Sequence, residues 1–338
     1  MERIPVALGN RSYNILLARN ALQQAGQHLK LNRRVLILTD TGVPESYAKT
    51  LAAQCSIPHI FKIPQGEKSK SLCTYGNILS YMLEHDFSRG DCVAAVGGGI
   101  CGDLGGFVAA SYMRGIDFYN IPTTVLAAVD SSVGGKTGVN LDGVKNIVGA
   151  FWQPHCVLID ADTLDTLPAR QRANGLAEAL KMAVVFDPAL FAMFEAGITR
   201  DNIETVIKRC VTLKKNIVEQ DERESGARRL LNFGHTVGHG IEACSLDGTL
   251  LHGECIGIGM LPMCSTALRP RVAQVLQKLG LPTHTSADPT QIYAALRHDK
   301  KASGDTVCVV LADALGKGYL QQMSLQTLEQ KCKEVCDI

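Results

Sequence analysis

The feature that most constrains the fold is a regular alternation of short apolar runs with helical patterns through the first half of the chain. Buried strands are predicted at 34–40, 92–96, 117–121 and 156–160, with helices at 71–84 and 103–113. Strands that alternate with helices build a parallel sheet with helices on both faces. We therefore expect the first half of the chain to fold as an α/β domain with a mostly parallel sheet.

From about residue 168 the pattern becomes mainly helical. Helices are predicted at 178–185, 188–195, 203–218, 230–243, 253–268, 271–279 and 289–296, with a strand at 306–311 and a short one at 318–320. A chain of 338 residues is longer than one hydrophobic core usually serves. We predict two domains, a Rossmann-like α/β domain over 1–165 and a mainly α-helical domain over 166–338.

The composition is that of an ordinary globular protein. Apolar residues make up 46% of the chain, charged residues 20%, and the net charge is +1. A near-neutral chain gives no reason to expect a nucleic-acid or membrane partner. The N-terminus lacks a signal pattern, and no run of about twenty apolar residues occurs.

The twelve cysteines do not form a disulfide pattern. No CxxC occurs, and many of the cysteines lie inside apolar stretches, where a thiol acts as a small hydrophobic group. These are Cys92, Cys101, Cys156, Cys255, Cys264 and Cys308. We therefore predict a reducing, cytoplasmic location.

A triple-glycine turn at 97–99 follows a predicted strand and precedes a predicted helix. Glycines let a pyrophosphate approach the backbone, and a helix N-terminus supplies N–H donors. Asp40, at the end of the first predicted strand, could hold a ribose hydroxyl. A nucleotide site is one interpretation, and a tight structural turn is the alternative because the spacing is not GxGxxG. Further glycine-containing turns at 66–70 and 131–140 favour the nucleotide.

Three histidines are candidates for binding a metal ion. His235 and His239 lie at i and i+4 of a predicted helix and share a face, and His252 follows after thirteen residues. Imidazoles that converge with one carboxylate form a site for a divalent metal such as zinc.

Glu178 is our choice for the carboxylate. It lies on an apolar helix, where an unpaired carboxylate is costly to bury. A buried salt bridge with Lys181 is the alternative role for Glu178, and Glu254 is the competing carboxylate.

Cations and amides are frequent in the same segments. They are Lys136, Lys145, Lys181, Lys214 and Arg228, with Arg114, Asn146 and Asn232. Such a set suits a substrate with several negative charges. Scattered surface cations are the alternative, and for Lys214 taken alone that alternative is preferred.

These segments together resemble 3-dehydroquinate synthase, over roughly residues 35–310. The matching stretches are GGGICGDLGGFVAASYMRG (97–115), IPTTVLAAVDSSVGGKTGVN (121–140), KNIVGAF (145–151), LAEALK (176–181), DERESGARRLLNFGHTVGHGIE (221–242), HGECIGIGM (252–260) and DKK (299–301). The resemblance implies a dehydroquinate synthase-like fold, a homodimer, and an active site in the cleft between the two domains.

The activity that the resemblance implies is that of a phosphate-eliminating carbon–oxygen lyase of the shikimate pathway. It converts the sugar phosphate 3-deoxy-D-arabino-heptulosonate 7-phosphate to 3-dehydroquinate and phosphate. NAD+ is used catalytically without net redox change, and the divalent metal is expected to be zinc, with cobalt as the alternative.

The resemblance also assigns residues. The metal would be held by Glu178, His235 and His252, while His239 would face the substrate phosphate. NAD would contact Asp40, Glu67, Lys70, Gly98, Gly99, Asp103, Thr123, Thr124, Asp130, Lys136, Lys145 and Thr166. The substrate would contact Arg114, Lys136, Lys145, Asn146, Lys181, Lys214, Arg228, Asn232, His239 and one of Lys300 and Lys301, with Lys300 our choice and Arg114 contributed by the same or a neighbouring subunit. Catalytic roles would fall to His239, Lys136, Lys181, Asp130, Asn146 and Lys145.

Three positions depart from the family pattern. Gly42 stands where many members have Asn beside the adenosine ribose, Ala128 replaces a common Gln, and Trp152 replaces His or Tyr. Three alternative functions stay open: another sugar-phosphate cyclase such as 2-deoxy-scyllo-inosose synthase, a metal-dependent polyol dehydrogenase such as glycerol dehydrogenase, and a non-catalytic NAD-binding protein.

Overall fold

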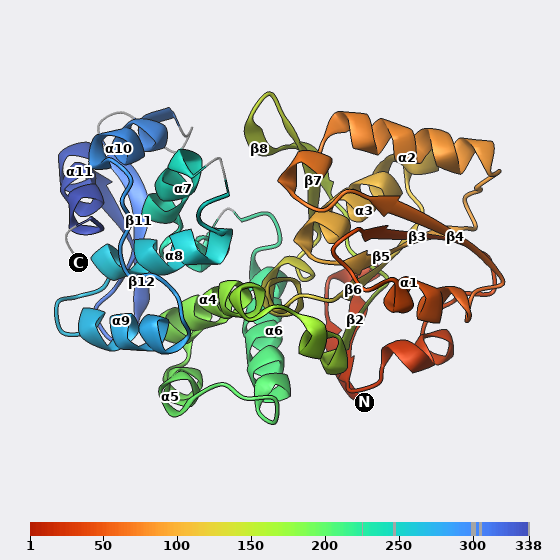
Figure 1. The fold of residues 1–338 in the computed structure, drawn as a ribbon, viewed down its shortest axis with the longest axis horizontal. Helices are drawn as coiled ribbons and strands as arrows, with labels where there is room; N and C mark the ends of the chain where they lie inside the picture. Colours follow the sequence, from red (N-terminus) through yellow and green to blue (C-terminus); the bar gives the residue numbers. More distant parts are fainter. Residues whose placement is uncertain (225, 246–247, 299–301, 304–305, 337–338) are drawn as a thin grey trace. The chain divides into compact units, whose positions relative to one another are not determined.

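The computed structural model describes residues 1–224, 226–245, 248–298, 302–303 and 306–336 (Figure 1). The chain divides into two compact units. The first comprises Met1–Leu167 with Ile203–Glu219, and the second comprises Pro168–Asn202 with Gln220–Ile338. Residues 203–219, which the sequence places in the second domain, therefore belong to the first unit.

The first unit is built on a seven-stranded sheet with the strand order β1-β2-β9-β6-β5-β3-β4 (Figure 1). Its strands are β1 (Glu2–Val6), β2 (Tyr13–Ala18), β3 (Arg34–Asp40), β4 (Ile57–Ile63), β5 (Cys92–Gly97), β6 (Asp117–Pro122) and β9 (Cys156–Asp160). β1 pairs with β2 antiparallel, and the other neighbours pair parallel. The predicted mostly parallel sheet is confirmed.

Helices cover both faces of this sheet because its central strands are buried on both sides. The helices of the first unit are α1 (Glu45–Ala52), α2 (Leu72–Glu84), α3 (Gly99–Ser111) and α6 (Ile203–Gln220). Along β3, Val35 and Ile37 pack in one apolar cluster with α1, whereas Leu36 and Leu38 pack in another with α2 and α3. This alternation follows from the pleat of a strand, whose successive side chains point to opposite faces.

Helix α6 is tied to the first two strands by polar contacts. Lys208 forms an ion pair with Glu2 at 2.9 Å, and the backbone N–H of Ala7 donates to Glu219 at 2.5 Å. These contacts are among those that join α6 to the first unit.

The glycine-rich segment 131–140 is only partly a turn. It leads into a hairpin of β7 (Lys136–Leu141) and β8 (Val144–Phe151) that was not predicted. A side-chain carbon at Gly149 would lie 2.0 Å from the carbonyl oxygen of Thr137. This glycine permits close strand pairing.

The second unit is mainly helical, as predicted. Its elements are α4 (Ala169–Phe186), α5 (Pro188–Ala196), α7 (His235–Cys244), α8 (His252–Met260), α9 (Arg269–Lys278), α10 (Pro289–His298), β10 (Ala302–Ser303), β11 (Thr306–Ala312), β12 (Gly318–Ser324) and α11 (Leu325–Glu334). The single helix predicted at 253–268 is wrong: α8 gives way to a short 3-10 turn that contains Pro262, because proline cannot continue the hydrogen-bond ladder.

Helix α4 is buried along most of its length. From Ala173 to Val185 every residue is buried, and Glu178 and Lys181 are the charged residues within that stretch. A helix that is apolar on all sides belongs in a core, so these two charges need partners there. Among the described residues, no helix is both long and apolar enough to cross a membrane.

Candidate active site

The triple-glycine turn lies where β5 meets α3. β5 ends at Gly97, Gly98 caps the helix, and α3 begins at Gly99, earlier than the predicted 103. A side-chain carbon at Gly98 would lie 3.2 Å from Thr124. The glycines place no side chain of their own at the helix N-terminus, as the predicted pyrophosphate site requires.

Three predicted ligands lie together beside this turn in the first unit. Lys70, which is buried, forms an ion pair with Asp103 at 2.5 Å and a hydrogen bond with Asn146. Burial raises the pKa of Asp103, and the nearby Lys70 ammonium opposes that rise. The carboxylate of Asp103 and the amide of Asn146 are thus held by one buried cation.

Asp40 ends β3 and is buried. Its Oδ1 accepts a hydrogen bond of 2.7 Å from the backbone N–H of Gly42, and its Oδ2 faces the thiol of Cys101 at 3.4 Å. A side-chain carbon at Gly42 would lie 2.3 Å from the Gln65 side chain. The Gln65 amide therefore occupies the space beside Gly42, the position at which the family resemblance leads us to expect Asn in many members.

The other predicted NAD contacts lie on the same unit. Glu67 accepts a hydrogen bond of 2.7 Å from Asn140, and the backbone N–H of Thr123 donates to Gly97 at 2.9 Å. The Thr166 hydroxyl lies 2.8 Å from that of Tyr47.

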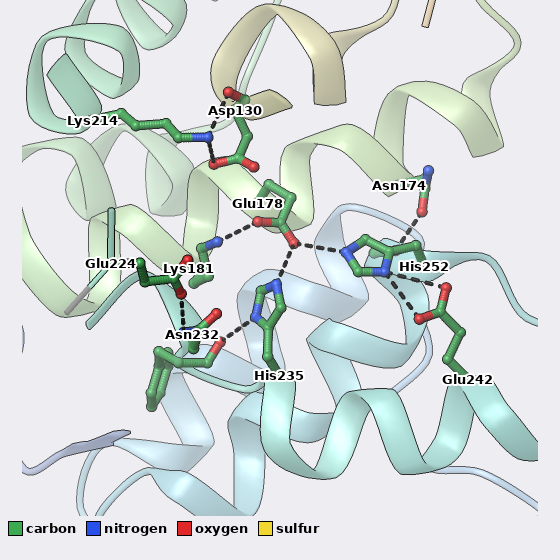
Figure 2. Close-up of polar contacts among 12 residues, drawn as sticks. Asp130, Asn174, Glu178, Lys181, Lys214, Glu224, Asn232, His235, Glu242 and His252 are labelled. Carbon is green, nitrogen blue, oxygen red and sulfur yellow. Dashed lines mark hydrogen bonds and ion pairs between the residues drawn. The ribbon is translucent and has the colours of Figure 1, made fainter. Parts of the chain in front are cut away.

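Lys214 is not a surface cation. It is buried, its Nζ lies 2.9 Å from the Asp130 carboxylate, and it donates to the Asp130 carbonyl oxygen at 2.6 Å (Figure 2). The preference for a surface role of Lys214 alone is therefore wrong. Its acidic partner, Asp130, is half-buried and lies far away in the sequence, so no sequence pattern indicates this pair.

Arg114 lies in a strained turn. Met113 and Arg114 have φ angles of 51° and 67°, a conformation that non-glycine residues rarely adopt, and Gly115 follows at 123°. Trp152 lies against Gly115, where an added carbon would meet the indole at 2.4 Å, and the Trp152 Nε1–H donates to Ile116 at 3.2 Å. Trp152, one of the three positions that depart from the family pattern, thus packs against the turn that contains Arg114.

Glu178, His235 and His252 come together in the second unit (Figure 2). Glu178 lies on α4, and the two histidines begin α7 and α8. The Oε1 atom of Glu178 lies 3.8 Å from His235 Nε2 and 3.4 Å from His252 Nε2. Two imidazoles and one carboxylate are a donor set that zinc prefers.

The remaining ring nitrogens have other partners. His235 Nδ1 lies 3.1 Å from the carbonyl oxygen of Phe233, and His252 Nδ1 lies 3.3 Å from both carboxylate oxygens of Glu242. Each acceptor requires a hydrogen on Nδ1. In both rings Nε2 is therefore the nitrogen that can bind a metal.

The alternatives for the carboxylate are resolved by burial and pairing. Lys181 forms an ion pair with Oε2 of Glu178, but the buried Oε1 atom makes no hydrogen bond among the described residues. Glu254 instead accepts two hydrogen bonds from Arg170, at 2.7 and 2.8 Å, and caps the start of α8. The Lys181 pair thus exists and leaves one oxygen of Glu178 available.

The charges of this cluster favour a cation. Burial alone would raise the pKa of Glu178, but Lys181, His235 and His252 hold that pKa well below its usual value. Burial, aided by Lys181, lowers the pKa of His235 well below its usual value, so its imidazole is neutral. Burial would also lower the pKa of His252, but the carboxylates of Glu178 and Glu242 raise it to about 10.

His239 lies beside the two other histidines. Its ring centre is 5.1 Å from that of His235 and 6.0 Å from that of His252. His239, Glu242 and His252 form a second group whose ligand atoms could hold a metal.

The remaining predicted substrate residues are distributed between the units. Arg228, which is buried, donates to the Glu222 carbonyl oxygen, and Asn232 donates to Glu224 at 2.7 Å. Lys136 begins β7 and Lys145 lies in β8. Lys300 and Lys301 lie outside the described residues.

Sequence reasoning missed Glu242 and Gln65. Glu242 is seven residues after His235, so it shares the helical face that identified the histidines, and this spacing could have found it. Gln65 has no comparable signal, because it approaches Gly42 from the loop that follows β4.

Comparison with known proteins identifies the family of this chain. Residues 60–174 match the family described as 3-dehydroquinate synthase N-terminal, and residues 175–302 match 3-dehydroquinate synthase C-terminal. The 3-dehydroquinate synthase of Desulforamulus reducens is 41% identical over 341 residues, which cover 94% of this chain and 95% of the relative. The chain belongs to the 3-dehydroquinate synthase family.

Solved structures of related cyclases share the fold of this 3-dehydroquinate synthase family member. A 2-deoxy-scyllo-inosose synthase in complex with carbaglucose-6-phosphate, NAD+ and Co2+ has a TM-score of 0.90 at 25% identity, covering 99% of this chain and 100% of that one. A 2-epi-5-epi-valiolone synthase from Streptomyces hygroscopicus with NAD+ and Zn2+ has a TM-score of 0.88 at 29% identity, covering 97% and 98%.

Proposed function

We propose that this chain converts 3-deoxy-D-arabino-heptulosonate 7-phosphate to 3-dehydroquinate and phosphate, acting as a phosphate-eliminating lyase. The family membership supports the substrate and the reaction. The geometric observation that carries the proposal is the buried Glu178 oxygen that faces two imidazole Nε2 atoms.

The chain's own residues fit both cofactors that its solved relatives hold. Glu178, His235 and His252 offer one oxygen and two nitrogens to a divalent ion, and the bare N-terminus of α3 at Gly98 and Gly99 suits a pyrophosphate. When bound, NAD+ supplies a reversible hydride acceptor, and the divalent ion lowers the pKa of the substrate hydroxyl that is oxidised.

Cationic residues of the chain balance the charges of the substrate. Lys136 and Lys181 would neutralise the substrate carboxylate and the charge that develops as the enolate forms. His239, Lys145 and Asn146 would hold the phosphate, which serves as its own base as it leaves. Arg114, Lys214, Arg228 and Asn232 complete the proposed substrate contacts.

Three further features stay predictions. They are assembly as a homodimer, a cytoplasmic location and an active site that both predicted domains share. The homodimer and the shared site rest on the family resemblance, and the location rests on the cysteine pattern.

Phosphate release is the experiment that tests the function. We expect the purified protein to release phosphate from the heptulosonate substrate when NAD+ and Zn2+ are present, with no net rise in nicotinamide absorbance. A polyol dehydrogenase would accumulate NADH. Another cyclase would prefer a sugar phosphate without the carboxylate, and a binding protein would release no phosphate; any of these results would contradict the proposal.

A further inference from the structure

His252 lies between two carboxylates that come from different helices. Its Nε2 faces Glu178 of α4 at 3.4 Å, and its Nδ1 faces both oxygens of Glu242 of α7 at 3.3 Å (Figure 2). An ionised carboxylate only accepts hydrogen bonds, so Nδ1 carries the hydrogen that points to Glu242. Nε2, which faces Glu178, is then the nitrogen that can offer its lone pair to an ion once it loses its proton.

The second possible metal group would use these atoms differently. A metal held by His239, Glu242 and His252 would need the Nδ1 lone pair of His252, or a carboxylate oxygen of Glu242 turned away from that ring. The Glu178 side chain is 2% exposed and has an oxygen without a hydrogen-bond partner among the described residues, whereas the Glu242 side chain is 16% exposed. A buried acceptor atom without a hydrogen bond is costly, so the ion belongs at Oε1 of Glu178.

We propose that Glu242 is a positioning residue for the metal site, and that it orients His252 through the Nδ1–H. This inference rests on the proposed metal role of His252. A carboxylate behind a histidine ligand fixes the ring and makes the metal-binding nitrogen more basic. Glu242 therefore strengthens metal binding without contacting the ion.

The place of His252 explains why such a partner is needed. His252 is the first residue of α8, and no preceding turn of that helix packs against its ring. His235 also begins its helix, and its Nδ1 is held by the backbone carbonyl of Phe233 at 3.1 Å. The two ligands thus have different supports, a neutral carbonyl for His235 and a charged side chain for His252.

Helix α7 supplies both a ligand and a support. Glu242 lies seven residues after His235, two turns along the same face of the helix. The same short helix thereby connects the position of one proposed ligand to the orientation of the other.

Zinc affinity of the purified chain, measured by competition with a chromophoric chelator, tests the proposal. We expect Glu242→Ala to bind zinc about 10–100-fold more weakly. Glu242→Gln should lose less, because its amide oxygen still accepts from Nδ1, and this variant serves if the alanine variant fails to fold. Glu254→Gln is the matched control: it removes a carboxylate two residues from His252 that pairs with Arg170, so it should lower thermal stability and leave zinc affinity unchanged.

The visible spectrum of the cobalt-loaded protein separates positioning from coordination. Because Glu242 is not a ligand in our proposal, the Glu242→Gln spectrum should keep the wild-type bands. Wild-type zinc affinity in both Glu242 variants would overturn the positioning role. Altered cobalt bands in Glu242→Gln, with metal retained in Glu178→Gln, would instead make Glu242 a ligand. A wild-type chain that binds neither ion would overturn the proposed function as well.

Discussion

The two proposed histidine ligands differ in charge although they share one carboxylate. Burial and Lys181 keep His235 neutral, whereas Glu178 and Glu242 raise the pKa of His252 to about 10. Without a metal, the proton on His252 supplies the positive charge that two carboxylates favour. A divalent ion bound to Nε2 would replace that proton as the source of positive charge.

Zinc binding should therefore release protons. The metal-free His252 is protonated at pH 8, and Nε2 must lose its proton before it binds an ion, whereas the low pKa values of Glu178 and His235 leave those groups deprotonated. We expect about one proton per zinc at pH 8, and an affinity that falls about tenfold per pH unit as the pH is lowered from 8.5 to 7. Calorimetry in two buffers of different ionisation enthalpy measures this number; no release at pH 8 would show that His252 is neutral.

Variants of His239 and Glu178 should differ in how much metal they bind. His239→Ala should keep its metal and release phosphate more slowly, because its imidazole would contact the phosphate rather than the ion. Glu178→Gln should lose both metal and turnover, since it removes the charge that faces two imidazoles. Metal analysis and phosphate release of the two variants provide the check. An empty site in His239→Ala would make His239 a ligand, and full activity of Glu178→Gln would refute its assignment.

Among the elements of the first unit, the sequence predicts the four almost wholly buried strands β3, β5, β6 and β9. β5 is buried throughout and was predicted from its apolar run. β4 was missed because it is an edge strand. Ile57 and Pro58 are exposed, and no continuous apolar run marks the strand in the sequence. The hairpin of β7 and β8 was missed because its glycines suggested a phosphate turn.

The site also divides into local and non-local features. The histidine spacing on α7 and the contact of His235 with the Phe233 carbonyl are local, whereas the partners of His252 and Lys214 lie further along the chain. Glu242 reaches His252 across a helix boundary, and Lys214 reaches Asp130 across 84 residues of chain. Such pairs depend on how helices pack, which a single sequence does not reveal.

Contact between α4 and α8 depends on Gly253. An added carbon at Gly253 would lie 1.9 Å from the carbonyl oxygen of Asn174, and the Gly253 N–H donates to the Asn174 side chain at 2.6 Å. We expect Gly253→Ala to destabilise the fold by about 1–3 kcal/mol or more, because the neighbouring atom is backbone and cannot move alone. His252 precedes Gly253, so zinc affinity should fall as well.

Gly76 of α2 is the matched control for this prediction. No atom lies within 4 Å of a carbon added there. Gly76→Ala should stabilise the fold by about 1 kcal/mol, because alanine has the higher helix propensity. Urea unfolding of the metal-free chains and zinc titration measure both effects; equal stability of the two variants would show that α4 and α8 can separate without cost.

At the scale of the whole molecule, the predicted NAD contacts belong to the first unit and the predicted metal ligands to the second. The proposed reaction needs both sets, because the carbon that loses a hydride is the carbon whose hydroxyl meets the ion. An oxidation that is later reversed on the same carbon leaves no net redox change. It also requires that the intermediate stays bound between the two hydride transfers, since a released ketone would leave NADH behind.

A substrate deuterated at carbon 5 tests this requirement. We expect the dehydroquinate product to keep the deuterium at that carbon, and NAD+ supplied far below the substrate concentration to support complete conversion. Mass spectrometry of the product and phosphate release measure the two results, and Glu178→Gln should show neither product nor exchange. Deuterium that appears in free NADH would mean that hydride leaves the protein between the two transfers. The chain would then behave as a dehydrogenase, and the proposed lyase reaction would be refuted.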